Sequence, residues 1–238
     1  WGVGYDLVDL KALAQRNIIF TNTPNANFAD VADLVFGLIV SLVRHIPQLH
    51  QNMMKTHDTN TSKGPGQRVS GKKIGIVGLG HIGQEVAQRA TGFRMQIGYF
   101  DRSVDDRYQR FDSLESLAQW ADFLVLAMPA TPETFHIVGA NVLKQLGPNG
   151  YLINIGRGAL VDTNALCEAL RNQSIAGAAL DVFEHEPNID PRLTELDNIV
   201  LTPHIGGSTI EAQQDAAQAK LRNIEAYLNG QELVGRIV

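Results

Sequence analysis

Short apolar runs alternate with helical patterns through the middle of the chain. The runs are too short and too uniformly apolar for amphipathic helices, and this pattern is typical of parallel strands that are buried on both faces. The expected strands are 73–78, 96–101, 122–128, 150–155, 176–182 and 198–201, and the expected helices between them are 82–90, 113–120, 142–146 and 163–172. This alternation predicts an α/β fold with a doubly wound parallel sheet of the Rossmann type.

Two longer helical patterns flank this region. Residues 27–54 are apolar around most of the helix circumference, and residues 208–228 are amphipathic. We expect Pro47 to kink the first helix or to end its regular part. For the wide apolar surface of this helix we favour a contact with a second subunit in a homodimer, and burial in the core of its own domain is the alternative.

The composition argues against several classes of partner. Hydrophobic residues make up 44% of the 238 residues and charged residues 19%, which suits a globular protein with a sizeable core. The net charge of -5 and the lack of a Lys/Arg-rich run argue against nucleic acid. The longest apolar segment, 34–43, is too short to cross a membrane. We therefore expect neither a nucleic acid nor a membrane as a partner.

Cys167 is the single cysteine of the sequence, and no Cys/His cluster has the spacing of a metal site. One thiol cannot form an internal disulfide, so we expect a reducing compartment, the cytoplasm, and no bound metal. The thiol lies in a helical pattern without an activating neighbour, and we interpret it as core packing.

Gly78, Gly80 and Gly83 have the spacing G-x-G-x-x-G, directly after an expected strand and at the start of an expected helix. In this context the first glycine permits a tight turn, the second lets the backbone approach a pyrophosphate, and the third lets helix and strand pack closely. The amide groups of the helix N-terminus add an anion site. The motif predicts a bound dinucleotide.

Asp101 ends the next expected strand, about 20 residues after the glycine motif. A carboxylate at this place accepts hydrogen bonds from the ribose diol of an adenosine, and its charge repels a 2′-phosphate. NAD is therefore favoured over NADP. The adjacent Arg102 would have to turn inward to hold a phosphate, and we interpret it as a solvated loop cation.

Three further strand ends carry polar groups directly after apolar runs. They are Arg157 in Ile-Gly-Arg-Gly, Glu186 in Asp-Val-Phe-Glu-His-Glu-Pro, and His204 in Thr-Pro-His-Ile-Gly-Gly. In doubly wound sheets, ligands bind outside the carboxyl ends of the strands. We therefore expect the three segments to converge on one crevice beside the cofactor.

Together these motifs resemble the D-isomer-specific 2-hydroxyacid dehydrogenase family. The resemblance also covers Gly2-Val-Gly-Tyr-Asp6 and Thr21-Asn-Thr-Pro24, so it runs through nearly the whole chain. It implies an oxidoreductase that transfers a hydride between NAD(H) and a small 2-oxo or 2-hydroxy acid. Residues 131–138 together with 153–158 look most like glyoxylate/hydroxypyruvate or hydroxyphenylpyruvate reductases.

The resemblance implies a catalytic constellation of Arg157, Glu186 and His204. Arg157 would hold the substrate carboxylate and polarise the reacting carbonyl, because a guanidinium has several fixed donors and a permanent charge. His204 would be the general acid in 2-oxoacid reduction and the base in the reverse direction. Glu186 would orient the ring of His204 and favour its imidazolium form. We interpret the nearby Glu184 as a solvated loop charge, because the family pattern places the acid directly before proline.

The resemblance also implies the contacts to cofactor and substrate. Asp181 would contact the nicotinamide carboxamide, and the backbone of Val3 and Gly4 would bind the substrate carboxylate together with Arg157. His81 stands where the family often has arginine, which weakens a side-chain contact to the pyrophosphate and leaves the backbone site intact. The expected cofactor-binding residues are Gly78, Gly80, His81, Ile82, Gly83, Asp101, Met128, Ile155, Gly156, Arg157, Asp181, His204, Gly206 and Gly207.

Two domains follow from the same resemblance. Residues 1–26 would be the C-terminal end of a truncated substrate domain, 27–204 the NAD-binding domain with its long leading helix, and 205–238 the segment that returns to the substrate domain. The chain begins with Trp1 rather than methionine, so we expect most of the substrate domain to be encoded upstream. On that basis this chain alone should bind NADH but turn over oxoacids poorly.

The motifs alone leave other functions open. NAD-sensing transcriptional corepressors share the fold and the triad, so a regulatory binding protein is the alternative. A bare dinucleotide-binding module is a further possibility, but it leaves the triad unexplained. The pairing of histidine with glutamate rather than glutamine argues against a formate dehydrogenase.

Overall fold

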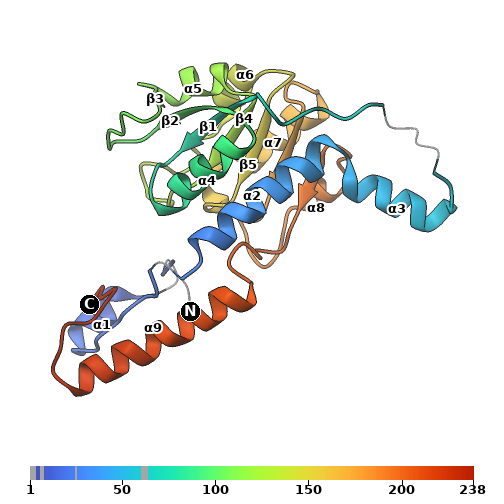
Figure 1. The fold of residues 1–238 in the computed structure, drawn as a ribbon. Helices are drawn as coiled ribbons and strands as arrows, with labels where there is room; N and C mark the ends of the chain where they lie inside the picture. The colour runs from blue at the N-terminus through green and yellow to red at the C-terminus, as the bar shows by residue number, and fades with distance from the viewer. Residues whose placement is uncertain (1–3, 6–7, 25, 60–63) are drawn as a thin grey trace. The chain divides into compact units, whose positions relative to one another are not determined.

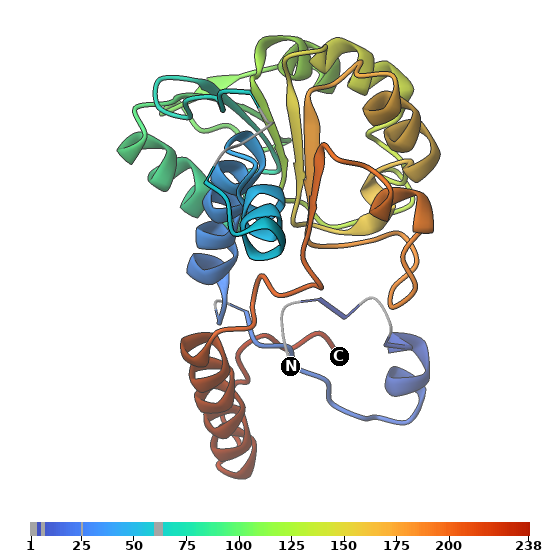
Figure 2. The ribbon, with the colours of Figure 1, turned by 90° about the vertical axis from the view of Figure 1, so that its right-hand side faces the viewer.

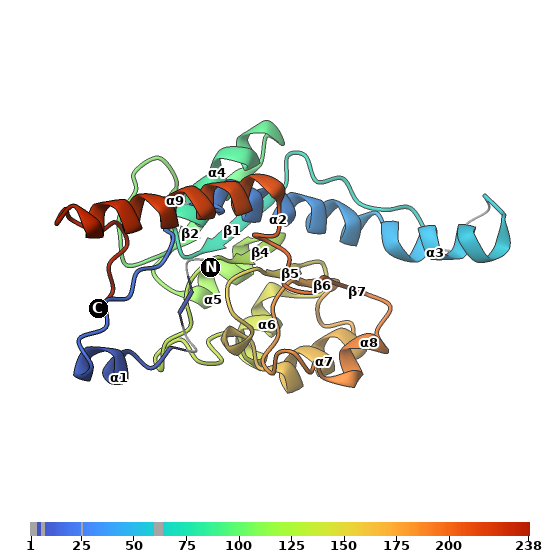
Figure 3. The ribbon, with the colours of Figure 1, turned by 90° about the horizontal axis from the view of Figure 1, so that it is seen from below.

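A seven-stranded parallel sheet forms the centre of the computed structural model, which describes residues 4–5, 8–24, 26–59 and 64–238. The strands are β1 (Lys73–Val77), β2 (Gln96–Phe100), β3 (Gln109–Arg110), β4 (Phe123–Leu126), β5 (Tyr151–Asn154), β6 (Gly177–Leu180) and β7 (Ile199–Leu201). Their order is β3-β2-β1-β4-β5-β6-β7, and Figure 3 shows β2, β1, β4, β5, β6 and β7 following one another across the sheet. The strand order reverses between β1 and β4, which is where doubly wound sheets bind ligands. The predicted fold class is confirmed.

Helices cover both faces of the sheet (Figures 1 and 2). On one face lie α2 (Phe28–Val43) and α4 (His81–Gly92), and on the other α5 (Leu114–Trp120), α6 (Ala140–Leu146) and α7 (Thr163–Arg171). The ring of Phe36 in α2 stacks on Phe93 after α4, with centroids 4.9 Å apart. On the opposite face, a Cβ on Gly75 of β1 would lie 2.9 Å from Leu117 of α5. Every residue of β4, β5 and β6 is buried, as expected for strands covered on both faces.

Cys167 belongs to the core between the sheet and helices α5, α6 and α7. Its side chain is fully buried, and this burial raises the pKa of the thiol. A protonated, enclosed thiol is inert, so the interpretation of Cys167 as core packing is confirmed.

Two predicted helices, 113–120 and 208–228, begin one and two residues later than their patterns suggest, and the predicted helix at 163–172 begins where expected. Ser113, Asp162 and Thr209 each stand at the N-cap, where the side chain accepts a hydrogen bond from a backbone amide of the first turn. Capping side chains of this kind satisfy amides that have no partner inside the helix. These residues therefore start the helices α5, α7 and α9 (Ile210–Leu228) without belonging to them.

The pattern at 27–54 forms two helices rather than one. After α2 the chain breaks at Arg44 and His45, and α3 (Ile46–Thr56) begins with Pro47 in its first turn. His45 has a φ of 54°, in the left-handed region, which ends α2. The apolar surface of α2 is largely buried within the chain, whereas α3 has no buried residue and exposes Met53 and Met54.

One strand is missing from the sequence-based prediction. β3 consists of Gln109 and Arg110, which are both exposed at the edge of the sheet beside β2. Two polar residues produce no apolar run, so the hydrophobic pattern contains no signal for this strand. The short helices η1 (Gly158–Leu160) and α8 (Pro191–Thr194) have three and four residues, too few to show a helical period.

The chain divides into two compact units, Ala32–His204 and a smaller unit of Trp1–Val31 with Ile205–Val238. Within the smaller unit, α1 (Leu10–Gln15) precedes a segment that pairs with the C-terminus. Phe20 donates its amide to the carbonyl of Val238 at 3.2 Å, and an isolated antiparallel bridge joins Thr21 to Arg236. No helix among the described residues has the length and apolar character to cross a membrane.

Candidate active site

The loop between β1 and α4 takes its shape from its glycines. Gly78 has a φ of 92°, which glycine adopts without strain. A Cβ on Gly78 would lie 2.7 Å from the Cβ of Met128, and a Cβ on Gly83 would overlap the carbonyl oxygen of Gly78. A Cβ on Gly80 would meet nothing within 4 Å, so this part of the backbone borders open space. Gly80 is the N-cap of α4, where backbone amides remain for an anion.

The carboxylate of Asp101 joins the end of β2 to this loop. Its Oδ2 accepts from the amide of Leu79 at 2.7 Å, and its Oδ1 accepts from the amide and the hydroxyl of Ser103, both at 2.7 Å. Burial alone would raise the pKa of Asp101, but these hydrogen bonds and the charge of Arg102 outweigh burial and lower it. Asp101 is thus ionised at neutral pH, and the side chain of Arg102 is exposed.

Met128, Ile155 and Gly156 follow β4 and β5 and lie beside the glycine loop. A Cβ on Gly156 would come within 2.6 Å of the carbonyl oxygen of Met128, whose Cβ faces Gly78. The amide of Ile155 donates to the carbonyl of Leu126, at 3.4 Å, and the side chain of Ile155 is buried. The ends of β1, β4 and β5 are therefore in close contact where the strand order reverses.

Arg157 lies in the turn after β5, which Asn154 holds in place. Asn154 is buried, its Oδ1 accepts from the amide of Gly156 at 3.1 Å, and its Nδ2 donates to the carbonyl of Arg157 at 2.9 Å. The partly buried guanidinium of Arg157 donates to the carbonyl of Gly156 at 2.8 Å. A buried amide with both ends bonded fixes the turn from which the guanidinium projects.

Asp181 joins the ends of β6 and β7. Its carboxylate is buried and accepts from the hydroxyl of Thr202 at 2.6 Å. The amide of Thr202 donates to the carbonyl of Leu180 at 2.9 Å. Because a buried carboxylate needs donors, Thr202 stabilises the place of Asp181 at the carboxyl edge.

His204 and Glu186 form a direct pair after β7 and β6. The distance between Nδ1 of His204 and Oε2 of Glu186 is 2.8 Å. The other carboxylate oxygen of Glu186 accepts from the amide of Phe183 at 2.9 Å. The carboxylate is thus held at both oxygens, and Nε2 is the ring nitrogen that remains for a ligand.

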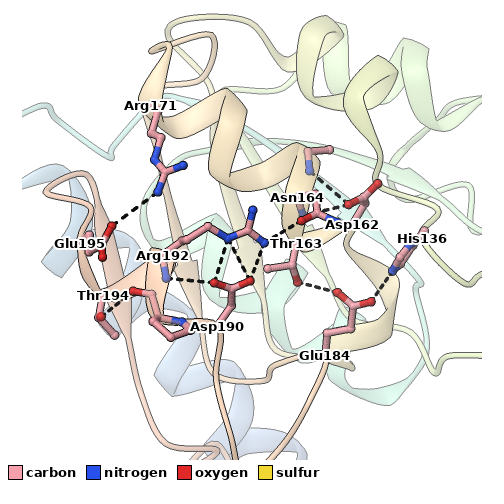
Figure 4. Close-up of polar contacts among 12 residues, drawn as sticks. His136, Asp162, Thr163, Asn164, Arg171, Glu184, Asp190, Arg192, Thr194 and Glu195 are labelled. Carbon is pink, nitrogen blue, oxygen red and sulfur yellow. Dashed lines mark hydrogen bonds and ion pairs between the residues drawn. The ribbon is translucent and has the colours of Figure 1, made fainter.

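The interpretation of Glu184 as a solvated loop charge is wrong. Its Oε1 lies 2.7 Å from Nε2 of His136, and its Oε2 accepts from the hydroxyl of Thr163 at 2.6 Å (Figure 4). Burial alone would raise the pKa of Glu184, but the hydrogen bonds from Thr163 and His136 lower it overall. The error arose because Thr163 and His136 are far from Glu184 in the sequence, so local pattern contains no trace of them.

Several predicted contacts lie outside the larger unit. Gly206 and Gly207 belong to the smaller unit, where a Cβ on Gly207 would lie 2.5 Å from Nδ2 of Asn27. Gly4 is exposed in the same unit, and Val3 lies outside the described residues. The larger unit contains all three residues of the predicted triad. Among the described residues, no group of three or more His, Cys, Asp or Glu could hold a metal ion.

Sequence reasoning missed three side chains that shape this edge of the sheet. Asn154 and Thr202 stand at the ends of apolar runs, and a polar residue at that place is a signal that could have identified them. His136 lies in a polar connection after β4 and has no such signal. Only its contact with Glu184 reveals it.

A Rossmann sheet with a glycine loop, an ionised acid after β2 and a histidine–glutamate pair at the far strands defines an NAD-dependent dehydrogenase. The family model of the NAD-binding domain of D-isomer specific 2-hydroxyacid dehydrogenases matches residues 36–206. This chain belongs to the D-isomer-specific 2-hydroxyacid dehydrogenase family. The predicted family, an enzyme that transfers a hydride between NAD(H) and a small 2-oxo or 2-hydroxy acid, is confirmed.

Individual relatives support this assignment over nearly the full chain. The chain is 41% identical over 242 residues to the glyoxylate reductase of Pyrococcus horikoshii, covering 97% of this chain and 72% of that protein. It is also 41% identical over 244 residues to the hydroxyphenylpyruvate reductase of Plectranthus scutellarioides, covering 100% and 77%. The structure of a 2-hydroxyacid dehydrogenase from Ketogulonicigenium vulgare Y25 has a TM-score of 0.92 and 39% identity, covering 100% and 76%. These relatives support an enzyme rather than a regulatory protein.

Proposed function

We propose that Arg157, Glu186 and His204 carry out the reaction of this dehydrogenase, the reduction of a small 2-oxo acid to a D-2-hydroxy acid and its reverse. The observation that supports this most directly is the 2.8 Å contact between Nδ1 of His204 and Oε2 of Glu186. A ring held through Nδ1 presents Nε2 to the substrate. That geometry suits a group that gives a proton to the carbonyl oxygen and takes it back in the reverse direction.

The glycine loop and its neighbours fit the cofactor. NAD(H) supplies or takes the hydride when it is bound. The open space at Gly80 and the amides at the start of α4, with His81 and Ile82, suit a pyrophosphate. Asp101 is ionised and held in place, so it can accept from a ribose diol and disfavour a 2′-phosphate. In this proposal, the remaining cofactor contacts come from Gly78, Gly83, Met128, Ile155, Gly156, Arg157, Asp181, His204, Gly206 and Gly207.

Arg157 binds the substrate carboxylate and the reacting oxygen in this mechanism. A guanidinium has five N–H donors. In Arg157, Nη1 donates to the carbonyl of Gly156. The turn that carries it is fixed by the buried Asn154. A fixed positive charge at the carbonyl oxygen stabilises the negative charge that develops there during reduction. By the family resemblance, Val3 and Gly4 are further candidates for binding the substrate carboxylate.

We propose glyoxylate and hydroxypyruvate as the substrate class, because the relatives named above include a glyoxylate reductase and a reductase of another 2-oxo acid. The test is NADH oxidation by the protein that carries this chain, with glyoxylate, hydroxypyruvate, pyruvate, phenylpyruvate and 3-phosphohydroxypyruvate in parallel. We expect the highest kcat/KM with glyoxylate or hydroxypyruvate. Background rates with all five acids would contradict the proposed reaction.

Arg157→Lys tests the role of the guanidinium within the same assay. Lysine keeps the positive charge but loses the planar pair of donors, so we expect kcat/KM to fall by roughly 100-fold. The affinity for NADH, measured by fluorescence titration, should change little. Unchanged turnover in Arg157→Lys would contradict a bidentate contact to the substrate.

Residues 1–26 and 205–238, which lie within the smaller unit, are the part we assign to a substrate domain, and 27–204 are the part we assign to the NAD-binding domain. We further propose a cytoplasmic homodimer whose contact involves α3, because Ile46, Met53 and Met54 are exposed there. The free thiol of Cys167 is compatible with a reducing compartment. Sedimentation equilibrium of the protein, with Met53→Glu as the disrupting variant, tests the dimer.

A further inference from the structure

Glu184 connects three separate segments of the larger unit (Figure 4). It belongs to the connection after β6, His136 to the connection between β4 and α6, and Thr163 is the first residue of α7. Glu184 contacts His136 at 2.7 Å and Thr163 at 2.6 Å. The side chains of His136 and Glu184 are only 28% and 17% exposed, so water competes little for this pair.

His136 is also tied to the segment that follows Arg157. Its amide donates to the carbonyl of Ala159 at 2.8 Å, and the amide of Val138 donates to the carbonyl of Leu160 at 3.0 Å. His136 has a φ of 52°, in the left-handed region that residues other than glycine rarely adopt. Such a conformation costs on the order of 1 kcal/mol and persists where surrounding contacts determine it. The backbone and the side chain of His136 therefore join the segments after β5 and β6.

A direct backbone contact brings these two segments together. A Cβ on Gly158 would overlap the carbonyl carbon of Phe183 and the amide nitrogen of Glu184. Only glycine permits this approach. Gly158, the residue after Arg157, therefore lies directly against the backbone of Phe183 and Glu184.

The contact continues from Glu184 to the catalytic pair. The amide of Phe183, the residue before Glu184, donates to Oε1 of Glu186 at 2.9 Å, and Oε2 of Glu186 meets His204. A cavity of about 200 Å³ borders Val182, Phe183 and Glu184. Packing alone therefore leaves this side of the segment room to move, and the polar contacts of Glu184 restrict that movement.

We infer that His136 and Glu184 are positioning residues for the reaction: the hydrogen bond between them holds the segment 182–186 against the turn of Arg157, and so keeps Glu186 and His204 in register with the guanidinium. This inference rests on the proposed roles of Arg157, Glu186 and His204. Neither His136 nor Glu184 contacts substrate in this assignment, and both act through the backbone of Phe183. Small displacements of reacting groups lower rates steeply, so a contact away from the substrate can still matter for turnover.

Glu184→Gln and His136→Ala in the protein that carries this chain test the inference. The glutamine is nearly isosteric and can still accept from Thr163, so the fold is kept while the charge is lost. We expect kcat for 2-oxoacid reduction to fall roughly 10-fold in each single variant. KM for the oxoacid and the Kd for NADH should change less than about twofold, because the binding groups stay in place. The double variant should lose little more than either single variant, since both remove one contact.

Asp190→Ala is the matched control in the same connection. Asp190 is also partly buried and ion-paired, at 2.6 Å from Arg192, and caps α8 (Figure 4). It has no hydrogen bond to the segment of Glu186 among the contacts of the described residues. Its loss should lower the melting temperature but leave kcat within about twofold. An equal loss of kcat in Asp190→Ala and Glu184→Gln would overturn the inference, because it would indicate general loosening.

The proposed function and the positioning role of His136 and Glu184 would be contradicted by different results. If Glu186→Gln and His204→Ala reduce turnover strongly while Glu184→Gln and His136→Ala leave kcat unchanged, the positioning role is wrong and the proposed function stands. If Glu186→Gln and His204→Ala leave turnover intact, the proposed function is wrong, and the positioning role, which depends on it, is wrong as well. A rise in the Kd for NADH that matches the fall in kcat would also overturn the positioning role.

Discussion

Glu184 and Glu186 lie on the same connection after β6, and each contacts a histidine from elsewhere in the chain, His136 and His204. The two pairs differ mainly in their access to solvent. In the pair His204–Glu186 the side chains are 51% and 36% exposed, and in the pair His136–Glu184 they are 28% and 17% exposed. The shortest contacts are nearly equal, 2.8 Å and 2.7 Å. The same residue types at the same distance thus occur in two environments only two positions apart along the chain.

Exposure and the free ring nitrogen distinguish the two proposed roles. The pair at His204 leaves Nε2 for a ligand, whereas the pair at His136 uses Nε2 for Glu184 itself. A proton donor must be accessible to its substrate, whereas a hydrogen bond that positions a segment must be protected from competing water. A histidine–glutamate pair is therefore evidence for proton transfer only together with the geometry of its second nitrogen.

The largest expected difference between the pairs is in turnover. His204→Ala should lower kcat for 2-oxoacid reduction by roughly 1000-fold, because the proton donor is lost, while His136→Ala should lower it only about 10-fold. Steady-state kinetics with saturating NADH measure both. Similar losses in the two variants would remove the distinction between a proton donor and a positioning residue.

Gly158→Ala breaks what the two pairs share, the backbone contact at Phe183 and Glu184. The new methyl group cannot fit against the backbone, so we expect a loss of about 3 kcal/mol in the free energy of unfolding. Urea denaturation monitored by circular dichroism measures this loss. Gly37→Ala in α2 is the control, because a Cβ there meets nothing within 4 Å and alanine favours the helix. A stable Gly158→Ala variant would show that the segment can move away at little cost.

The smallest expected effect is in acid stability. The pKa of Glu184 is lowered from its usual 4.5, because the hydrogen bonds from Thr163 and His136 outweigh the effect of burial, which acts in the opposite direction. A carboxyl with a lowered folded pKa contributes stability that is present above its unfolded pKa and is lost as the pH falls through the folded value. Glu184→Gln should therefore flatten the fall in melting temperature below about pH 4.5. If the melting temperatures of the wild type and the variant fell in parallel between pH 6 and pH 3, this contribution would be contradicted.

Motifs with local geometry could be predicted from the sequence. The apolar runs predicted six strands of the sheet, and the glycine spacing predicted the loop in which Gly78 has a φ of 92°. Both depend on residues that are close together in the chain, since burial on two faces and a tight turn are properties of short segments. The capping residue Ser113 moved the start of one predicted helix by one residue, and the helix after Asp162 begins at Thr163 as predicted.

Features that depend on distant contacts could not be predicted. The two-residue strand β3 has no apolar pattern. The break between α2 and α3, by contrast, lies just before Pro47, as the sequence suggested. The buried surface of α2 belongs to the core of the chain itself, although the pattern also suited an interface. Periodicity specifies which face is apolar but not what covers it.

The sequence alone determined the order of strands and helices and the polar residues that follow each strand, because these depend on short-range periodicity and on the parallel alignment of strand ends. It thereby identified Arg157, Glu186 and His204 as candidates. The family resemblance had paired Glu186 with His204, 18 positions away, but only the tertiary structure revealed that Glu184 meets His136, 48 positions away. Contacts at such separations arise from the packing of whole elements, so the partner of a buried charge is determined by the fold rather than by its neighbours in the chain.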